Sequence, residues 1–168
     1  MTRLPIVLFP DPILRRPCLA VSPADASLRQ LAADMLETMY AAPGRGLAAP
    51  QIGVARRLFV MDCGWKTGTP TPRVCLNPEI LDAAPGLAIN TEGCLSIPGV
   101  SAQVARPEWV VLRWQDLDGA VHEHRLEGFE SVCAQHELDH LNGRLCIDLM
   151  TEDARGAASA TLAAMGAR

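Results

Sequence analysis

Two histidines, His136 and His140, stand four residues apart, with Glu137 directly after the first. Residues at this spacing lie one above the other on a helix, so both imidazoles can reach the same metal ion. Glu137 can then touch a water molecule at that ion and take its proton. The pattern also occurs on helix surfaces without a metal, but here both histidines share an apolar face, where a buried imidazole needs a partner. The segment therefore predicts a metal site for hydrolysis.

A hydrolytic site with two histidines needs a third protein ligand and an open position for water. Cys146 is one candidate, because it ends an H-E-x-x-H-x-x-G-x-x-C run, the metzincin protease spacing with cysteine in place of the last histidine. Cys94 is the other, because Gly93 lets the backbone approach closely and the Leu95 amide can act as a donor. Spacing alone leaves both open, whereas Cys133 would crowd the histidines on their own helix.

A third segment, residues 44–51, is rich in small residues and reads Gly-Arg-Gly-Leu-Ala-Ala-Pro-Gln. Its glycines suit a backbone that packs closely against a ligand, and Gln51 supplies a neutral amide that can aim at a developing oxyanion. Taken alone, the segment also reads as a plain loop between a helix and a strand. Its meaning therefore depends on the other two segments.

Together, the three segments resemble those of peptide deformylases, whose signatures are G-x-G-L-A-A-x-Q, E-G-C-L-S and Q-H-E-x-D-H-L. This chain carries them in family order at residues 44–51, 92–96 and 135–141. The resemblance runs from the Pro-Asp-Pro segment at residues 10–12 to Asp148, nearly the whole chain. It implies an enzyme that removes the formyl group from the N-terminal N-formylmethionine of nascent polypeptides and releases formate.

The resemblance also implies roles within the site. It gives proton transfer to Glu137 and oxyanion binding to the Gln51 side chain and the Leu95 amide. Cys146 becomes a core residue after the helix. The family's metal is ferrous iron (Fe2+), and Zn2+, Ni2+ or Co2+ can occupy the site, whereas two histidines and one cysteine by themselves would suggest zinc. The metal ligands that the resemblance implies are Cys94, His136 and His140.

Peptides bound by this family lie as an added strand beside the Gly-rich loop, with the methionine side chain in an apolar pocket next to the metal helix. Arg45 and Asn90 depart from the family, because many relatives carry aliphatic residues there, and the preference after methionine stays open. Relatives with a long basic C-terminal helix dock on the ribosome, and the Ala-rich tail after Thr151 leaves such docking open. The positions that match the substrate groove are Gly44, Arg45, Gly46, Gly93, Arg106, Phe129, Val132 and Cys133.

Two other interpretations use the same residues. A metzincin-like metalloendopeptidase would take Cys146 as its third ligand and cleave internal peptide bonds. A catalytically silent deformylase-like protein would keep the fold as a binding module, although the three ligands, Glu137 and Gln51 are all present. Deformylation of a formylated peptide distinguishes both from the main interpretation.

The elements that must hold these residues follow from hydrophobic periodicity. A helix of roughly four turns is expected after Pro23, and a second at residues 129–141, ended by Asn142 and Gly143. The turn signal Asp118-Gly119 predicts a hairpin between the last two strands. The pattern predicts an α+β fold with mainly antiparallel sheets in a single domain of residues 1–168. The resemblance implies that this domain is catalytic and that its sheets pack around a central metal-binding helix. The expected strands are residues 58–61, 74–76, 80–81, 100–104, 110–114 and 121–126.

Composition limits the partners and the location of the protein. The chain has 168 residues, of which 49% are hydrophobic and 20% charged, with a formal net charge of -4. This charge favours neither nucleic acid nor an anionic membrane. The apolar run at residues 4–9 is too short for a signal sequence, and the six cysteines include no C-x-x-C pair. We therefore expect a cytoplasmic protein without disulfides, acting as a monomer.

Overall fold

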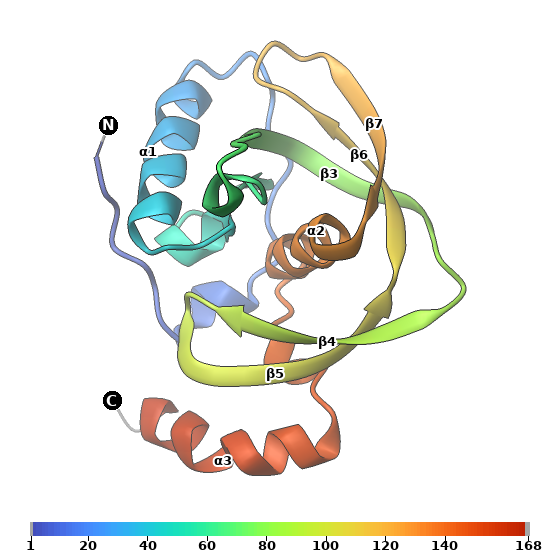
Figure 1. The fold of residues 1–168 in the computed structure, drawn as a ribbon. Helices are drawn as coiled ribbons and strands as arrows, with labels where there is room; N and C mark the ends of the chain where they lie inside the picture. Colours follow the sequence, from blue (N-terminus) through green and yellow to red (C-terminus); the bar gives the residue numbers. More distant parts are fainter. Residues whose placement is uncertain (1, 167–168) are drawn as a thin grey trace.

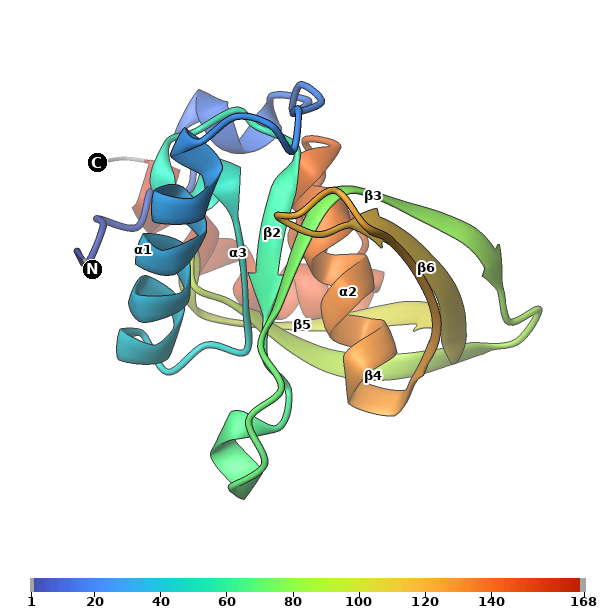
Figure 2. The same ribbon diagram turned by 90° about the horizontal axis from the view of Figure 1, so that it is seen from above.

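The computed structural model describes residues 2–166, in which two antiparallel sheets surround one central helix (Figures 1 and 2). The helices are α1 (Ser27–Ala41), α2 (Gly128–Leu141) and α3 (Glu152–Gly166). The strands are β1 (Gly46–Ala48), β2 (Leu58–Met61), β3 (Arg73–Ala83), β4 (Leu87–Cys94), β5 (Ile97–Pro107), β6 (Trp109–Gln115) and β7 (Val121–Glu127). Short 3-10 helices are η1 (Pro12–Arg15), η2 (Ala49–Ile52), η3 (Trp65–Thr67) and η4 (Cys146–Asp148).

The sheets are antiparallel throughout and present free edges to the same region. The larger sheet has the order β1-β2-β3-β6-β7, and the smaller one pairs β4 with β5. Within residues 2–166, β1 is therefore an edge strand of one sheet and β4 has an unpaired edge in the other. Figure 2 shows α2 between the two sheets, whereas α3 packs on β5 outside them. The α+β class with mainly antiparallel sheet is confirmed.

Helix α2 is buried on nearly all sides. From Ser131 to Leu141 none of its residues is exposed, and only Val132 and Asp139 are half-buried. A surface helix would show one apolar stripe, whereas a helix buried all round forms the centre of a core. The polar side chains on α2 must therefore find partners inside the protein, which is the condition for a preorganised site.

Most sequence-based elements are confirmed, and three were missed. The helix expected after Pro23 is α1, and the Asp118-Gly119 hairpin joins β6 to β7. The runs at residues 74–76 and 80–81 belong to one strand, β3, whose pairing shifts where Asn77 adopts a left-handed backbone with a φ of 49°. The missed elements are β1, β4 and α3. Among the described residues, no helix has the length and apolar character needed to span a membrane.

Gly143, where α2 ends, generates a stability prediction. Its φ is +72°, and a Cβ there would lie 2.3 Å from the backbone oxygen of Arg15. We expect Gly143→Ala to lower the free energy of unfolding by more than about 1 kcal/mol, because strain and a backbone clash add. Gly156→Ala is the matched control: a Cβ there meets nothing within 4 Å, so about 1 kcal/mol of stabilisation or no change is expected. Urea denaturation measures both, and equal stabilities would contradict the close approach.

Candidate active site

Cys94, His136 and His140 form a buried cluster of metal-binding side chains. Their ligating atoms all lie within 4.8 Å of one another, and Cys94 Sγ is 3.3 Å from His140 Nε2. Sulfur and nitrogen ligands around a tetrahedral ion lie ~3.5 Å apart, given the usual bond lengths. In addition, His140 Nδ1 is buried without a hydrogen-bond partner among residues 2–166. The cluster therefore fits one metal ion.

Cys94 reaches this cluster because of an irregularity in the small sheet. The pairing of β4 with β5 shifts register between Glu92 and Cys94, and both side chains are buried. Such a bulge redirects side chains at the end of a strand. No atom of the described residues requires a glycine at Gly93, because a Cβ there would meet nothing within 4 Å. The close approach is at Gly46 instead, where a Cβ would lie 2.3 Å from Glu137 Oε1.

A buried ion network orients His136. Its Nδ1 is 2.8 Å from Glu92 Oε2, which leaves Nε2 for the ligand cluster. Burial raises the pKa of Glu92, but hydrogen bonds from His136 and Arg106 outweigh it and lower the pKa. Burial lowers the pKa of His136, but the Glu92 hydrogen bond and nearby negative charges raise it to about 9. Burial also lowers the pKa of His140 and keeps that ring neutral.

Arg106 belongs to this network and not to the substrate groove. It is 4% exposed, and its guanidinium donates to both oxygens of Glu92, at 2.5 and 3.0 Å, and to Asp139 Oδ2 at 2.8 Å. A guanidinium held by two carboxylates inside the protein cannot reach a substrate. The expectation of a groove residue is therefore corrected: Arg106 lies behind the ligands and fixes Glu92.

Glu137 occupies the centre of the site with an unpaired oxygen. Its Oε2 is buried and has no hydrogen-bond partner in the described part of the chain, and its other oxygen faces Gly46. Burial raises the pKa of Glu137 to about 7, against the lowering effect of His136. A buried carboxyl group without a partner is costly unless a ligand or water completes it. Such a group is suited to exchange a proton with a bound water or ligand.

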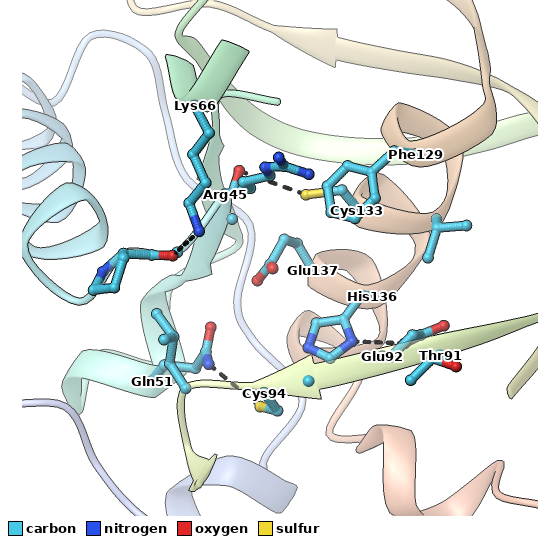
Figure 3. A pocket seen from close by; sticks show the side chains of 16 residues that line it. Arg45, Gln51, Lys66, Thr91, Glu92, Cys94, Phe129, Cys133, His136 and Glu137 are labelled. Atoms are coloured by element: carbon cyan, nitrogen blue, oxygen red, sulfur yellow. Dashed lines mark hydrogen bonds and ion pairs between the residues drawn. The ribbon is translucent and has the colours of Figure 1, made fainter. Parts of the chain in front are cut away.

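Gln51 directs its amide nitrogen into the site. The backbone N–H of Ala48 donates to Gln51 Oε1 at 2.8 Å, which turns Nε2 toward Cys94 Sγ at 3.6 Å and Ser96 Oγ at 3.2 Å. Figure 3 shows this amide beside Cys94. Leu95 follows Cys94 and also lines the cavity. A fixed neutral donor next to a metal cluster suits binding of a developing oxyanion.

One cavity of about 540 Å³ brings most of these residues together (Figure 3). All the predicted site residues line it except His140, which lies deeper, and Arg106. Phe129, Val132 and Cys133 of α2 form an apolar wall. Sequence reasoning missed Lys66, which reaches the cavity from a distant loop and has no local signal. The other lining residues that it did not single out as site residues are Pro43, Thr91 and Glu92.

Cys146 lies outside the ligand cluster. It is 3% exposed, on η4, and packs in a core cluster with Leu14, Val104 and Met150. Its thiol packs against Cys94, and this contact and burial raise the pKa of the Cys94 thiol. A metal ion would favour the thiolate at Cys94 instead. The fold therefore distinguishes the two cysteines left open by spacing, because Cys94 belongs to the ligand cluster and Cys146 contacts Cys94 from the core.

Comparisons with known proteins agree with this geometry. A family model described as polypeptide deformylase matches residues 3–156. A peptide deformylase of Mesorhizobium japonicum is 51% identical over 144 residues, covering 86% of this chain and 82% of the relative. One of Alkalilimnicola ehrlichii is 48% identical over 152 residues, covering 90% and 84%.

Solved structures of peptide deformylases are also similar to this chain. A peptide deformylase from Plasmodium falciparum superposes with a TM-score of 0.91 at 36% identity, over 95% of this chain and 94% of that one. One from Synechococcus elongatus, in complex with actinonin, superposes with a TM-score of 0.89 at 40% identity, over 95% and 88%.

The different positions of Cys94, inside the ligand cluster, and Cys146, outside it, generate a prediction. We expect Cys94→Ser to lose most bound metal, because its thiolate is replaced by a weak hydroxyl ligand, whereas Cys146→Ser keeps a metal content near that of the parent chain. Elemental analysis after gel filtration measures both, and circular dichroism checks folding. Equal metal loss in the two variants would contradict the ligand set.

Proposed function

The chain belongs to the peptide deformylase family, and we propose that the cavity holding Cys94, Gln51 and Glu137 is its active site. The enzyme removes the formyl group from the N-terminal formylmethionine of nascent peptides and depends on a metal ion. The observation that carries the proposal is the cluster of three ligand atoms at the cavity that Glu137 lines, where Glu137 Oε2 has no partner among the described residues.

Cys94, His136 and His140 would hold the metal ion. When bound, such an ion supplies Lewis-acid polarisation of the formyl carbonyl and makes water easier to deprotonate. We propose Fe2+ as the resident ion on the basis of the family resemblance. The ligand set also suits Zn2+, Ni2+ and Co2+, since imidazole and thiolate bind all of them. Metal analysis of anaerobically purified protein decides among these ions.

Glu137 would carry the proton through the reaction. Its free oxygen takes a proton from the water that attacks the formyl carbon, and it returns that proton to the amine nitrogen as the C–N bond breaks. The products are formate and a free N-terminal amine. Gly46 supports this role, because the absence of a Cβ leaves room for the carboxylate against β1.

Gln51 and Leu95 would stabilise the oxyanion that forms during the attack. The Gln51 Nε2 group and the Leu95 backbone N–H are the donors, and the Ala48 contact holds the Gln51 amide in position. A fixed donor needs no reorganisation in the transition state, and one such group is worth ~10²–10³ in turnover.

The substrate would lie between the free edges of β1 and β4, which both line the cavity. An extended peptide can add to either edge through backbone hydrogen bonds. The apolar wall formed by Phe129, Val132 and Cys133 would receive the methionine side chain. Gly44 and Gly93 also line this space.

The finer biological setting is also part of the proposal. We propose a single catalytic domain of residues 1–168 that acts as a monomer in the cytoplasm and does not bind nucleic acid. In the described residues of α3, Arg155 is the sole cation, and its guanidinium donates to the carbonyl oxygens of Ile147 and Asp148. This helix therefore offers little basic surface for the ribosome. The metzincin-like alternative lacks support, because Cys146 is outside the ligand cluster.

The experiment that tests the function is an anaerobic assay of formyl-Met-Ala-Ser against the same peptide without the formyl group. Formate release from the first and no cleavage of the second support the proposal. Internal cleavage of the unformylated peptide would indicate an endopeptidase. No activity of a metal-loaded sample on either peptide would indicate a binding protein.

Glu137→Gln separates proton transfer from metal binding. We expect it to keep the metal and lower kcat ~100-fold or more, because a carboxamide cannot accept the proton. Glu130→Gln on the same helix is the matched control, since Glu130 pairs with Arg73. It should keep turnover near that of the parent. Near-normal turnover by Glu137→Gln would show that another group is the base.

A further inference from the structure

Two cations line the cavity on the opposite side of Glu137 from Cys94 (Figure 3). The guanidinium carbon of Arg45 lies 4.6 Å from the centre of the Phe129 ring, and Arg45 Nε is buried without a hydrogen-bond partner. Lys66 Nζ donates to the carbonyl oxygen of Pro43. Among residues 2–166, neither cation has a carboxylate within ion-pair distance.

Arg45 projects from a well-anchored backbone. The N–H of Gly44 donates to Met39 O at 2.8 Å, and Trp65 Nε1 donates to Gly44 O at 2.8 Å. The carbonyl oxygen of Arg45 accepts from Asp62 N at 2.9 Å. The anchored backbone and the contact with the Phe129 ring already restrict the Arg45 side chain. Binding of a partner would therefore cost little additional conformational entropy.

Two acidic groups near the cavity, Glu130 and Glu92, are already paired with cations of their own. Glu130 is held by two hydrogen bonds from Arg73, at 3.0 and 3.2 Å. Glu92 is held by Arg106 and His136. Glu137 also lines the cavity, but among the described residues it forms no ion pair with Arg45 or Lys66, so a carboxylate partner for these cations must come from what enters the cavity. A guanidinium stacked on a ring still presents its N–H edge, which matches the two oxygens of a carboxylate.

We propose that Arg45, assisted by Lys66, makes the enzyme prefer peptides with an acidic side chain close behind the formylmethionine. The inference rests on the proposed function, which places the formyl group beside Cys94, Gln51 and Glu137. The rest of the peptide then leaves past the opposite part of the cavity, where both cations lie. A carboxylate there gains two charge-assisted partners, whereas an ammonium group is repelled.

The test compares catalytic efficiency, kcat/KM, on formyl-Met-Asp-Ala, formyl-Met-Lys-Ala and formyl-Met-Ala-Ala. The parent enzyme should favour the Asp over the Lys peptide by about twofold to fivefold, the range for partly exposed ion pairs. The ratio should fall toward unity at ~1 M salt, where the Debye length is ~3 Å. Comparison of formyl-Met-Ala-Asp with formyl-Met-Ala-Ala shows whether an acidic side chain at the third residue also raises kcat/KM. A preference for the acidic side chain at either position supports the proposal.

Three substitutions and one control connect the ratio to the cavity. Arg45→Gln should bring it close to unity, Arg45→Lys should restore part of it, and Lys66→Gln should reduce it partly. Arg113→Gln removes an exposed cation paired with Glu123 on neighbouring strands of the large sheet, and should leave the ratio unchanged.

The outcomes separate this inference from the proposed function. If the parent deformylates formyl-Met-Ala-Ala but prefers neither formyl-Met-Asp-Ala over formyl-Met-Lys-Ala nor formyl-Met-Ala-Asp over formyl-Met-Ala-Ala, the inference is overturned and the function stands. An equal loss of preference in Arg113→Gln and Arg45→Gln also overturns it, since net charge would then explain the ratio. No formate from any formylated peptide refutes the function itself.

Discussion

A buried carboxylate, Glu92, connects the two halves of the active site. It sits at the end of β4, binds Arg106 on β5 and orients His136 on α2. Burying a charged group costs desolvation free energy. Attraction between the buried charges compensates for this cost only when each charge has hydrogen-bonding partners at good geometry. The position of β4 relative to α2 is therefore fixed by this network. Cys94 lies two residues further along the same strand, so the network also fixes its place relative to the histidines of α2.

The second constraint is the depth of α2. Because both sheets cover it, its polar groups can be stable only when they bind one another or a ligand. His136 satisfies this condition through Glu92, whereas His140 Nδ1 and Glu137 Oε2 are left without partners among the described residues. In the part of the chain that the structure describes, the third buried side-chain atom without a partner is Arg45 Nε, so all three belong to residues proposed for metal binding, proton transfer or substrate binding. Such sites lower stability and are retained for function.

Sequence patterns predicted the parts of the site that depend on local spacing. His136, Glu137 and His140 lie within one helix, whose periodicity is visible in the sequence. Cys94 and Cys146 could not be distinguished in this way, because the choice depends on where a bulge on β4 meets α2.

Long-range register accounts for the other failures. Arg106 was expected in the groove, but in the β4–β5 pairing it lies opposite Ala88 and turns its guanidinium inward to Glu92 and Asp139. Strand β4 was missed because its apolar residues Leu87 and Ile89 are exposed whereas its buried positions are Glu92 and Cys94, so it lacks the usual alternation of buried apolar and exposed polar residues. Helix α3 was missed because its alanines show no clear stripe.

The order of charges along the cavity explains why Gln51 is neutral. A lysine or arginine at that position would lie next to the Cys94 thiolate and near Glu137, so it would compete with the metal ion and neutralise the base. An amide can donate to an oxyanion without altering either group. The lysine and arginine that line the cavity lie beyond Glu137, at Lys66 and Arg45, where the aromatic ring of Phe129 holds the arginine away from the ligands. The cavity thus separates a chemical centre, which must stay free of positive side chains, from an outer region that can read the charge of the peptide.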